Sequence, residues 1–160
     1  MNVRIITLFF SLVIAAAAQQ VEIKSLHWSA DEKAGVTVFT GNVIITRNQD
    51  KMWADKVVVT ADANQEVDRF DAEGNTAFEL YLEDNRTFKG HSERFVYEPQ
   101  KKLFTLTGNA MVEDVTNERK IYGEEIVLNE ITKKAEVSGE VQKPVKVIFK
   151  LKEDNASADR

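Results

Sequence analysis

Hydrophobic and polar residues alternate along most of this chain with the period of a β-strand. In Phe104–Val112 every second residue is apolar or small, and polar residues such as Thr105 and Thr107 lie between them. The same period of two recurs in Phe39–Ile45 and in Phe70–Leu80. This alternation is typical of strands with one buried and one exposed face. We therefore expect a sheet that has one apolar face.

A glycine recurs within these strand patterns at nearly constant intervals. Four copies of an apolar-x-Gly pattern are present, at Phe39–Val43, Ala72–Thr76, Leu106–Ala110 and Val137–Val141. Their glycines are 33, 34 and 31 residues apart along the chain. A period of this size indicates a repeated supersecondary unit. Because glycine inside a strand marks a bulge or a bend, we expect the sheet to bend along the line of these glycines.

A second strand pattern alternates with the glycine strands. It consists of a small residue, an acid, a charged residue and three apolar residues, and its copies are Ala54–Val59, Ser92–Tyr97 and Gly123–Leu128. The recurring acids are Asp55, Glu93 and Glu124. A position that recurs in each repeat favours a structural role, such as a turn at the start of a strand or a cross-strand pair with Lys56 or Arg94.

Polar clusters separate the strand patterns at Arg47–Asp50, Glu98–Lys101 and Val115–Glu118. The second repeat is longer than the others, and its extra residues predict an extended hairpin tip at Leu82–Thr87. The clearest alternation is in the last run, Val145–Leu151. Many short strands joined by polar turns predict an all-β sandwich, barrel or roll.

The first residues have the three-part pattern of a secretory signal peptide. Arg4 supplies the positive charge, Ile5–Ile14 is mainly apolar, and Ala15–Ala18 are small residues of a cleavage site. The apolar run is shorter than the roughly 20 residues that a membrane-spanning helix needs. We expect cleavage, with an uncleaved anchor as the alternative. The expected division of the chain is a signal peptide at 1–18, a β domain at 19–151 and a disordered tail at 152–160.

Composition narrows the function classes. The chain has 160 residues, of which 43% are hydrophobic and 29% charged, so it is long enough and apolar enough for one globular domain. Its net charge of −5 argues against a nucleic-acid partner, because phosphate binding needs a basic face. The chain has no cysteine, which excludes disulfides, thiol catalysis and cysteine metal ligands.

Candidate catalytic or metal-binding residues are sparse. His27 and His91 are the two histidines, they are far apart in sequence, and a zinc site needs three or four ligands. We expect both to be exposed polar residues, and we expect no cofactor. The chain has no nucleophile elbow or phosphate loop, so an enzyme is not expected. Trp28 and Trp53 are expected in the core rather than at the mouth of an apolar cavity.

Two segments match an acceptor pattern for bacterial asparagine glycosylation, in which an acid lies two residues before the asparagine of Asn-x-Ser/Thr. The acceptors are Asn85, preceded by Glu83, and Asn155, preceded by Glu153. Both lie in segments that are expected to be exposed, and the plain tripeptide pattern occurs often by chance. Glycosylation of Asn85 and Asn155 is therefore a hypothesis.

The chain resembles the LptA/OstA-like family of periplasmic lipopolysaccharide export proteins. The resemblance is carried by the signal peptide, the repeated strands that read apolar-x-Gly-Asn-Val-x-Ile, and the interleaved strands with a small residue, an acid and three apolar residues. It covers the chain from about Val21 to Leu151. It implies a twisted open β-jellyroll of many short antiparallel strands, here built from about four degenerate repeats.

The resemblance also implies a function without catalysis. Such a protein would bind lipopolysaccharide in the periplasm and carry it from the inner to the outer membrane. Its partners would be other copies joined head to tail and the membrane components of the same machinery. The acyl chains would lie against inward-facing side chains, for which we expect Phe39, Val43, Ile45, Phe70, Phe78, Phe95, Tyr97, Phe104, Leu106 and Ile126.

Three alternatives remain open at this point. The chain could be an inner-membrane component of the same pathway, anchored by an uncleaved N-terminal helix. It could be a periplasmic structural adaptor that pairs edge to edge and binds no lipid. The ten inward-facing residues could also fill one another's space as a packed core, because a periodic pattern does not distinguish a core from a groove.

Overall fold

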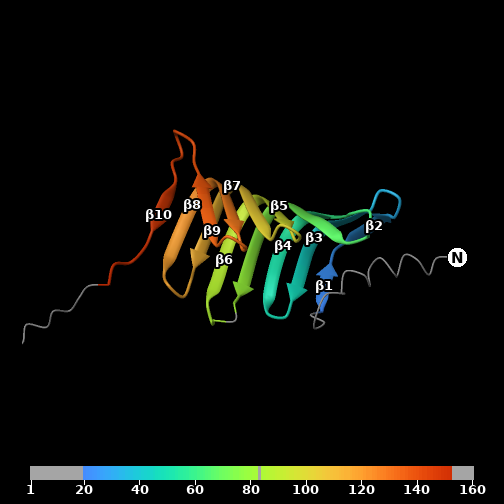
Figure 1. Ribbon diagram of the computed structural model, residues 1–160, viewed down its shortest axis with the longest axis horizontal. Coiled ribbons are helices and arrows are strands. Elements are labelled where there is room, and N and C mark those ends of the chain that lie inside the picture. The colour runs from blue at the N-terminus through green and yellow to red at the C-terminus, as the bar shows by residue number, and fades with distance from the viewer. Residues whose placement is uncertain (1–19, 83, 153–160) are drawn as a thin grey trace, which may run out of the picture.

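The computed structural model describes residues 20–82 and 84–152, which fold as a single antiparallel sheet (Figure 1). The strands are β1 (Val21–Lys24), β2 (His27–Asp31), β3 (Val36–Arg47), β4 (Asp50–Ala61), β5 (Val67–Tyr81), β6 (Thr87–Glu98), β7 (Leu103–Asp114), β8 (Arg119–Asn129), β9 (Lys134–Ser138) and β10 (Lys146–Ile148). The prediction of an all-β fold is confirmed. The expected signal peptide and residues 153–160 of the expected tail lie outside the described residues.

The sheet has ten strands in the order β1-β3-β4-β5-β6-β7-β8-β10, and β2 and β9 pair with β3 and β8. Strands that follow one another from β3 to β8 are neighbours in the sheet because short turns join them, as antiparallel pairing allows. The predicted turns are confirmed. The expected extension of the tip between β5 and β6 is wrong, because that turn spans 82–86 and is no longer than the turn at 62–66 between β4 and β5; the extra residues of the second repeat lengthen β5 instead. Within the described part of the chain, no helix is long and apolar enough to cross a membrane.

The central strands are longer than the sequence patterns suggested, because each continues through a bend. β3 has 12 residues and β5 has 15. The bend lies at Gly41, Gly74 and Gly108, whose φ angles are between 80° and 84°, and the asparagine after each glycine also has a positive φ. At each bend the glycine strand has one residue more than its neighbours between paired positions. These bulges confirm that the sheet bends along the line of glycines.

The recurring acids hold the bends together. The amide of Asn75 donates a hydrogen bond of 3.0 Å to Asp55, and that of Asn109 donates one of 3.2 Å to Glu93. In both cases the acid precedes the bend on one strand and the asparagine lies in the bend of the next strand. The structural role is confirmed for Asp55 and Glu93, and for Glu124 it stays a prediction. The expected cross-strand pair with Arg94 is wrong, because Arg94 binds Asp71 of β5.

The fourth glycine copy does not form a bend. β9 ends at Ser138, directly before Gly139, and Glu140 stands where the other copies have asparagine. Glu140 instead pairs with Lys143 in a tight turn. The run that showed the clearest alternation forms a strand only at Lys146–Ile148. It lies at the edge of the sheet, where β8 is its one partner among residues 20–82 and 84–152.

Both halves of each bent strand contribute to one core. Phe39 before the bend of β3 and Val43 after it belong to the same buried cluster, as do Leu106 and Ala110 of β7. The sheet is therefore folded over its own apolar face, and this face is what we call the apolar interior. A two-residue period carried through a glycine bulge keeps that face continuous.

An ion pair on the outer face joins β5 to β6. Arg94 donates hydrogen bonds from Nε to Asp71 Oδ1 at 2.8 Å and from Nη2 to Asp71 Oδ2 at 2.5 Å. Arg69 approaches the same carboxylate at 3.5 Å. The hydrogen bond from Arg94, more than the charges of the two arginines, holds the pKa of Asp71 below its usual value. This two-pronged geometry is the strong form of an arginine–carboxylate pair.

Replacing Asp71 with asparagine is expected to lower the free energy of unfolding at about pH 7 by about 0.5–1 kcal/mol, since solvent screens a pair on the sheet surface. Because the folded-state pKa of Asp71 is lowered, its contribution is complete above the unfolded-state pKa and disappears as the pH falls through the folded-state value. Urea unfolding at about pH 7 and about pH 3 measures the free energy of unfolding of the unchanged protein and of Asp71→Asn. The difference in unfolding free energy between the two proteins should shrink at the lower pH. A difference that is equal at both pH values would contradict the assignment, and Asp68→Asn on the same strand is the control.

Candidate functional site: the apolar interior

The ten residues predicted to face inward all belong to the apolar interior. Six of them are buried, namely Phe39, Val43, Phe78, Phe95, Leu106 and Ile126. The other four are partly buried and pack against this cluster, namely Ile45, Phe70, Tyr97 and Phe104. Their inward orientation follows from the two-residue period, and their contact with lipid stays a prediction.

Small and branched residues complete the interior between the larger ones. Val57, Val59, Ala72 and Ala110 are buried in the same cluster but were absent from the predicted site. Val57 and Val59 lie in the second strand pattern, whose three consecutive apolar residues hide which of them face inward. The pairing of Val57 with Phe39 across β3 and β4 resolves this, because paired residues point to the same face.

Aromatic rings form a continuous row across β5, β6 and β7. Tyr97 stacks on Phe104 with ring centroids 4.3 Å apart, and on Phe70 at 6.3 Å. Phe95 lies 5.8 Å from both Phe104 and Phe78. Each of these separations is within the range of favourable ring contacts. The row gives the interior a wall of large, flat apolar groups.

The interior is uncharged. Among the described residues, the buried polar side chains are Thr76 and Ser92, and their hydroxyls lie 2.8 Å apart. Thr76 also donates to the Ser92 carbonyl at 2.7 Å, so this pair is satisfied without a ligand. Burial, and to a lesser extent the charge of Glu130, raises the pKa of Tyr97, which keeps its phenol neutral. Such an interior is suited to hydrocarbon chains and unsuited to ions.

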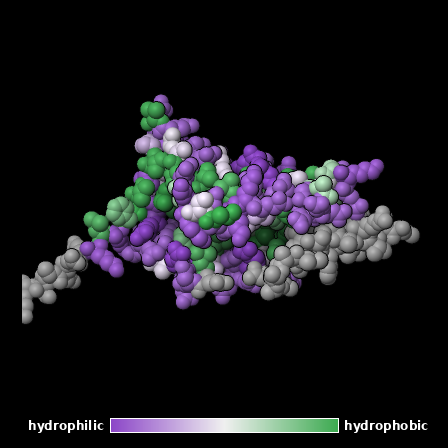
Figure 2. Space-filling view, viewed as in Figure 1, coloured by the Kyte–Doolittle hydropathy of each residue, from purple (hydrophilic) through white to green (hydrophobic). Residues whose placement is uncertain are grey.

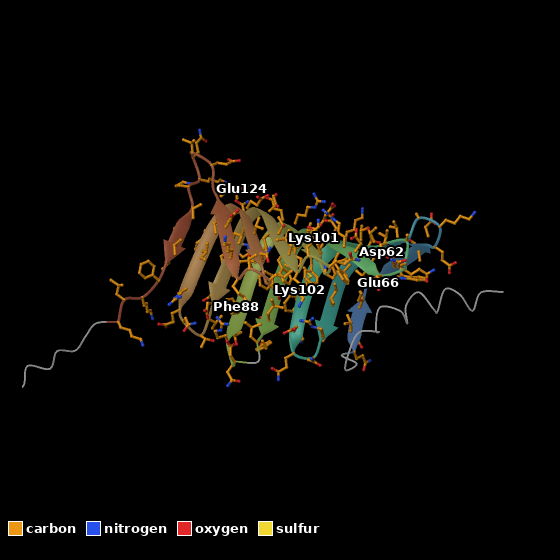
Figure 3. The ribbon with its side chains drawn as sticks, viewed as in Figure 1. Asp62, Glu66, Phe88, Lys101, Lys102 and Glu124 are labelled. Carbon is orange, nitrogen blue, oxygen red and sulfur yellow. The ribbon has the colours of Figure 1, made fainter. Side chains whose placement is uncertain are left out.

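Charged residues lie in the turns at the rim of the interior. Figure 3 shows Asp62 and Glu66 in the turn between β4 and β5, and Lys101 and Lys102 in the turn between β6 and β7. The two turns are joined by a hydrogen bond of 3.0 Å from Gln100 to Asp62. Polar turns thus border the apolar face along this rim.

The two ends of the sheet leave apolar residues exposed. At the C-terminal end the exposed residues include Val141, Val147, Phe149 and Leu151, and Figure 2 shows apolar surface gathered there. At the N-terminal end Trp28 is 46% exposed and pairs with Phe39. The expectation that Trp28 lies in the core is therefore wrong, because β2 is an edge strand with a partner on one side only.

The remaining candidate residues lie away from the interior. Trp53 is half-buried on the outer face, since it precedes the inward-facing Ala54, so its expected place in the core is also wrong. His27 and His91 are exposed, as predicted. The described residues contain no group of three or more side chains placed to hold a metal ion. Asn85 is exposed in the tip between β5 and β6, Asn155 lies outside the described residues, and their glycosylation stays a prediction.

The protein is a bent, open antiparallel β-roll with an uncharged apolar interior, and comparison with known proteins places it in a family. The sequence profile of the family described as LptA/(LptD N-terminal domain) LPS transport protein matches residues 22–134, and the chain belongs to this family. It is 37% identical over 99 residues to the lipopolysaccharide export system proteins LptA of Escherichia coli K12 and Shigella flexneri. This match covers 61% of the chain and 54% of each relative, so it spans about half their length.

A solved structure supports the fold. LptH of Pseudomonas aeruginosa, described as the LptA homologous periplasmic component of the conserved lipopolysaccharide transport device, superposes with a TM-score of 0.71. The superposition covers 83% of this chain and 96% of LptH, at 18% sequence identity. The predicted jellyroll-like fold is therefore confirmed, and the likeness at this identity concerns the fold alone.

Proposed function

We propose that this chain is a periplasmic transport protein that binds lipopolysaccharide and carries it from the inner toward the outer membrane. Its apolar interior would hold the acyl chains, while the phosphorylated sugar headgroup stays in water. The net negative charge of the chain is compatible with this arrangement, because the headgroup needs no basic pocket in the interior.

Membership of the family supports this function. The family is described as lipopolysaccharide transport proteins, and the relatives from Escherichia coli and Shigella flexneri are named for lipopolysaccharide export. LptH is described as a periplasmic component of such a system. A transport function agrees with the expectation that the chain is not an enzyme.

The observation that carries the proposal is the uncharged apolar interior, which extends from β3 to β8 and ends at exposed apolar residues on both sides. Burial of each methylene group of an acyl chain contributes about 0.8 kcal/mol, so several chains bind without any ionic contact. The aromatic row would lie along these chains. Lipid would replace contacts that the inward-facing residues now make with one another.

The edge strands support assembly into a bridge. Among the described strands, β1 and β2 at the N-terminal end pair on one side only, and β9 and β10 at the C-terminal end do the same. Unpaired strand edges accept a further strand from another chain. We propose that copies join head to tail through these ends, and that the terminal copies contact the inner-membrane and outer-membrane components of the machinery.

Site-specific photo-crosslinking in cells tests lipid binding. A photoreactive residue would replace Phe104, which packs against the interior, or Thr105, the next residue of β7, which faces outward. A lipopolysaccharide adduct is expected at position 104 and not at position 105. The two positions are adjacent in one strand, so the pair of variants is matched for expression and location.

The absence of a lipid adduct at both positions would contradict the proposal. If the same cells gave protein adducts from the terminal strands, the chain would be a structural adaptor with a packed core. The anchored inner-membrane alternative concerns residues 1–18, and an intact mass of the mature protein decides whether they are removed.

A further inference from the structure

The inward-facing residues of the edge strand β2 are left uncovered. All five residues of this strand are exposed. Trp28 is 46% exposed, although its partner Phe39 on β3 is only 4% exposed. Ala30 lies two positions after Trp28 and therefore faces the same way. The inward face of the sheet thus ends in solvent at an edge that can accept a further strand.

One row of paired residues crosses the whole inward face of the sheet. It starts at Trp28 on β2 and ends at Val137 on β9. Its members, each paired with the next, are Trp28, Phe39, Val57, Ala72, Phe95, Leu106, Ile126 and Val137. The residues that precede the four repeated glycines by two positions recur in this row at every second strand from β3 to β9. Successive repeats therefore stack without sliding along the strands.

The directions of the strands allow a second copy of the chain to continue this row. Neighbours are antiparallel at each step from β2 through β3–β8 to β9, so β2 and β9 run in opposite directions. A copy that is shifted along the sheet without being turned round presents its β2 antiparallel to β9 of the first copy. Antiparallel edges exchange backbone hydrogen bonds directly. If the copies stack as the repeats do within one chain, Val137 lies opposite Trp28.

The same placement brings opposite charges together on the outer face. Three positions from the Val137–Trp28 pair, Lys134 lies opposite Asp31. Oδ1 of the Asp31 carboxylate accepts two backbone N–H groups of the turn that follows β2, at 3.0 Å each. These bonds hold the carboxylate in place, and Oδ2 has no partner among the described residues. Lys134 forms no ion pair within residues 20–82 and 84–152, so both charges are available to a second copy.

Sliding one copy along the strands would lose this match. A slide of two residues in one direction would place Glu136 opposite Asp31, and like charges opposite each other on neighbouring strands are destabilising. A slide of two residues in the other direction would place Lys134 opposite the uncharged Ser29. A slide of one residue would set outward-facing residues beside inward-facing ones. The charge pattern therefore agrees with the register that the stacking of the repeats indicates.

The other half of the bent sheet accepts this placement. β10 of one copy would lie beside β1 of the next, with the inward-facing Val147 opposite Ile23. Lys146 and Lys24 would also lie opposite each other, but each has a partner within its own copy. Lys146 lies 4.2 Å from the centre of the Tyr122 ring, and Lys24 is 3.4 Å from the Glu22 carboxylate. These like charges therefore oppose the junction only weakly, and β9 and β2 set its register.

We propose that β9 of one copy pairs antiparallel with β2 of the next, in the register that places Val137 opposite Trp28 and Lys134 opposite Asp31. The inference rests on the proposed head-to-tail assembly and names the contacts that specify it. Val137 and the neighbouring inward-facing Ala135 cover Trp28 and Ala30, so that the apolar interior of one copy continues into the next. The ion pair between Lys134 and Asp31 is exposed, and it contributes to the choice of register more than to affinity.

Disulfide formation reports this register directly, because the chain has no cysteine of its own. A protein with Lys134→Cys is mixed with one that carries Asp31→Cys and, separately, with one that carries Ser29→Cys, and each mixture is oxidised. Residues directly opposite each other on paired strands are within disulfide range, whereas those displaced by two positions are at its limit. We expect the mixture with Asp31→Cys to form a linked dimer several times faster than the mixture with Ser29→Cys. Each variant oxidised alone is the control and should not form dimers, since identical ends do not meet.

Trp28 reports the affinity of the junction in a Trp53→Phe background, because these two are the only tryptophans. Its emission should move to shorter wavelength as the protein concentration rises, since Val137 of the next copy covers the indole ring. The concentration at the midpoint of this shift gives the Kd of self-association. Trp28→Phe leaves Trp53, which lies on β4 away from both ends of the sheet, and its emission should not change with concentration.

A double-mutant cycle in the Trp53→Phe background tests the ion pair. Asp31→Asn keeps an oxygen that accepts the two hydrogen bonds of the turn, and Lys134→Gln removes the opposite charge. Each change alone should raise the Kd about two- to fivefold, as expected for one screened pair, and the double variant should raise it no further than the larger single effect. Lys133→Gln removes an exposed lysine of the adjacent turn and should leave the Kd unchanged. Additive effects of the two changes would overturn the pairing of Asp31 with Lys134.

The remaining outcomes separate this inference from the proposed function. A dominant disulfide between the Lys134→Cys and Ser29→Cys proteins would overturn the register and leave head-to-tail assembly standing. Dimers from Asp31→Cys oxidised alone would show that two β2 edges meet, which contradicts the junction. No linked dimer and no shift of Trp28 at any concentration would overturn the junction as well, whereas a lipid adduct at Phe104 would leave lipid binding standing.

Discussion

Replacing Leu106 with alanine is expected to destabilise the folded protein by about 2–5 kcal/mol, the cost of removing a large side chain from a closed core. Leu106 is fully buried and pairs with Phe95 on one side and Ile126 on the other, both of which are themselves buried. The space left by the shorter side chain would thus lie where side chains from the adjacent strands β6, β7 and β8 meet. Thermal unfolding should show a midpoint lower by about 5–15 °C for a chain of this size.

Leu151→Ala is the matched control, because it makes the same chemical change at a residue that is 81% exposed. Its unfolding midpoint should remain close to that of the unchanged protein. A small effect of Leu106→Ala, similar to that of Leu151→Ala, would contradict a packed interior around Leu106. It would instead indicate that the two halves of the sheet separate easily.

Replacing Gly74 with alanine is expected to cost about 2–4 kcal/mol, from backbone strain and steric overlap together. Gly74 has a φ of 80°, a conformation that residues with a side chain rarely adopt. A Cβ atom at this position would also overlap the side chain of Asp55, which is held there by Asn75. Urea unfolding followed by circular dichroism measures the loss.

A double variant separates the two causes. Asp55→Gly removes all three atoms that a Cβ at position 74 would meet, the Cβ of Asp55 included, and alone it should cost about 1–2.5 kcal/mol through the lost hydrogen bond to Asn75 and the added freedom of the unfolded backbone. Combined with Gly74→Ala, the loss should be smaller than the sum of the single losses by about 1 kcal/mol or more. Strict additivity would show that the strained backbone alone accounts for the effect of Gly74→Ala.

The alternation of residues along the strands was sufficient to predict which side chains face inward. Phe104 and Leu106 lie in the interior while Thr105 lies on the other face, as the period of two requires. The spacing of the glycines was sufficient to predict the line of the bend. Both signals are local, since each depends on the geometry of one strand and not on its neighbours.

Features that depend on neighbouring strands could not be predicted in the same way. The partner of Asp55 is Asn75, which is 20 residues away and adjacent only after β4 and β5 have paired. The sequence offered Lys56, which is adjacent along the chain but on the opposite face. Trp28 was expected in the core, and its exposure follows from the position of β2 at the edge.

For the candidate site, the sequence predicted which side chains line the apolar interior but not where the interior opens to solvent. The ten predicted residues share one interior because their strands stack in chain order. At the N-terminal end β1 and β2 separate onto the two halves of the bent sheet and leave a shallow hollow beside Trp28 and Phe39, which no alternation pattern specifies.

The hydrogen bonds from Asn75 to Asp55 and from Asn109 to Glu93 have a consequence for the evolution of length in this fold. Each bond joins one two-stranded repeat to the next, and neither end of the sheet is needed to form it. A duplicated repeat inserted between two existing ones would find the same partners at both junctions. It would lengthen the roll by two strands, or about 9–10 Å. The reach of such a protein can therefore change by whole modules while its cross-section stays constant.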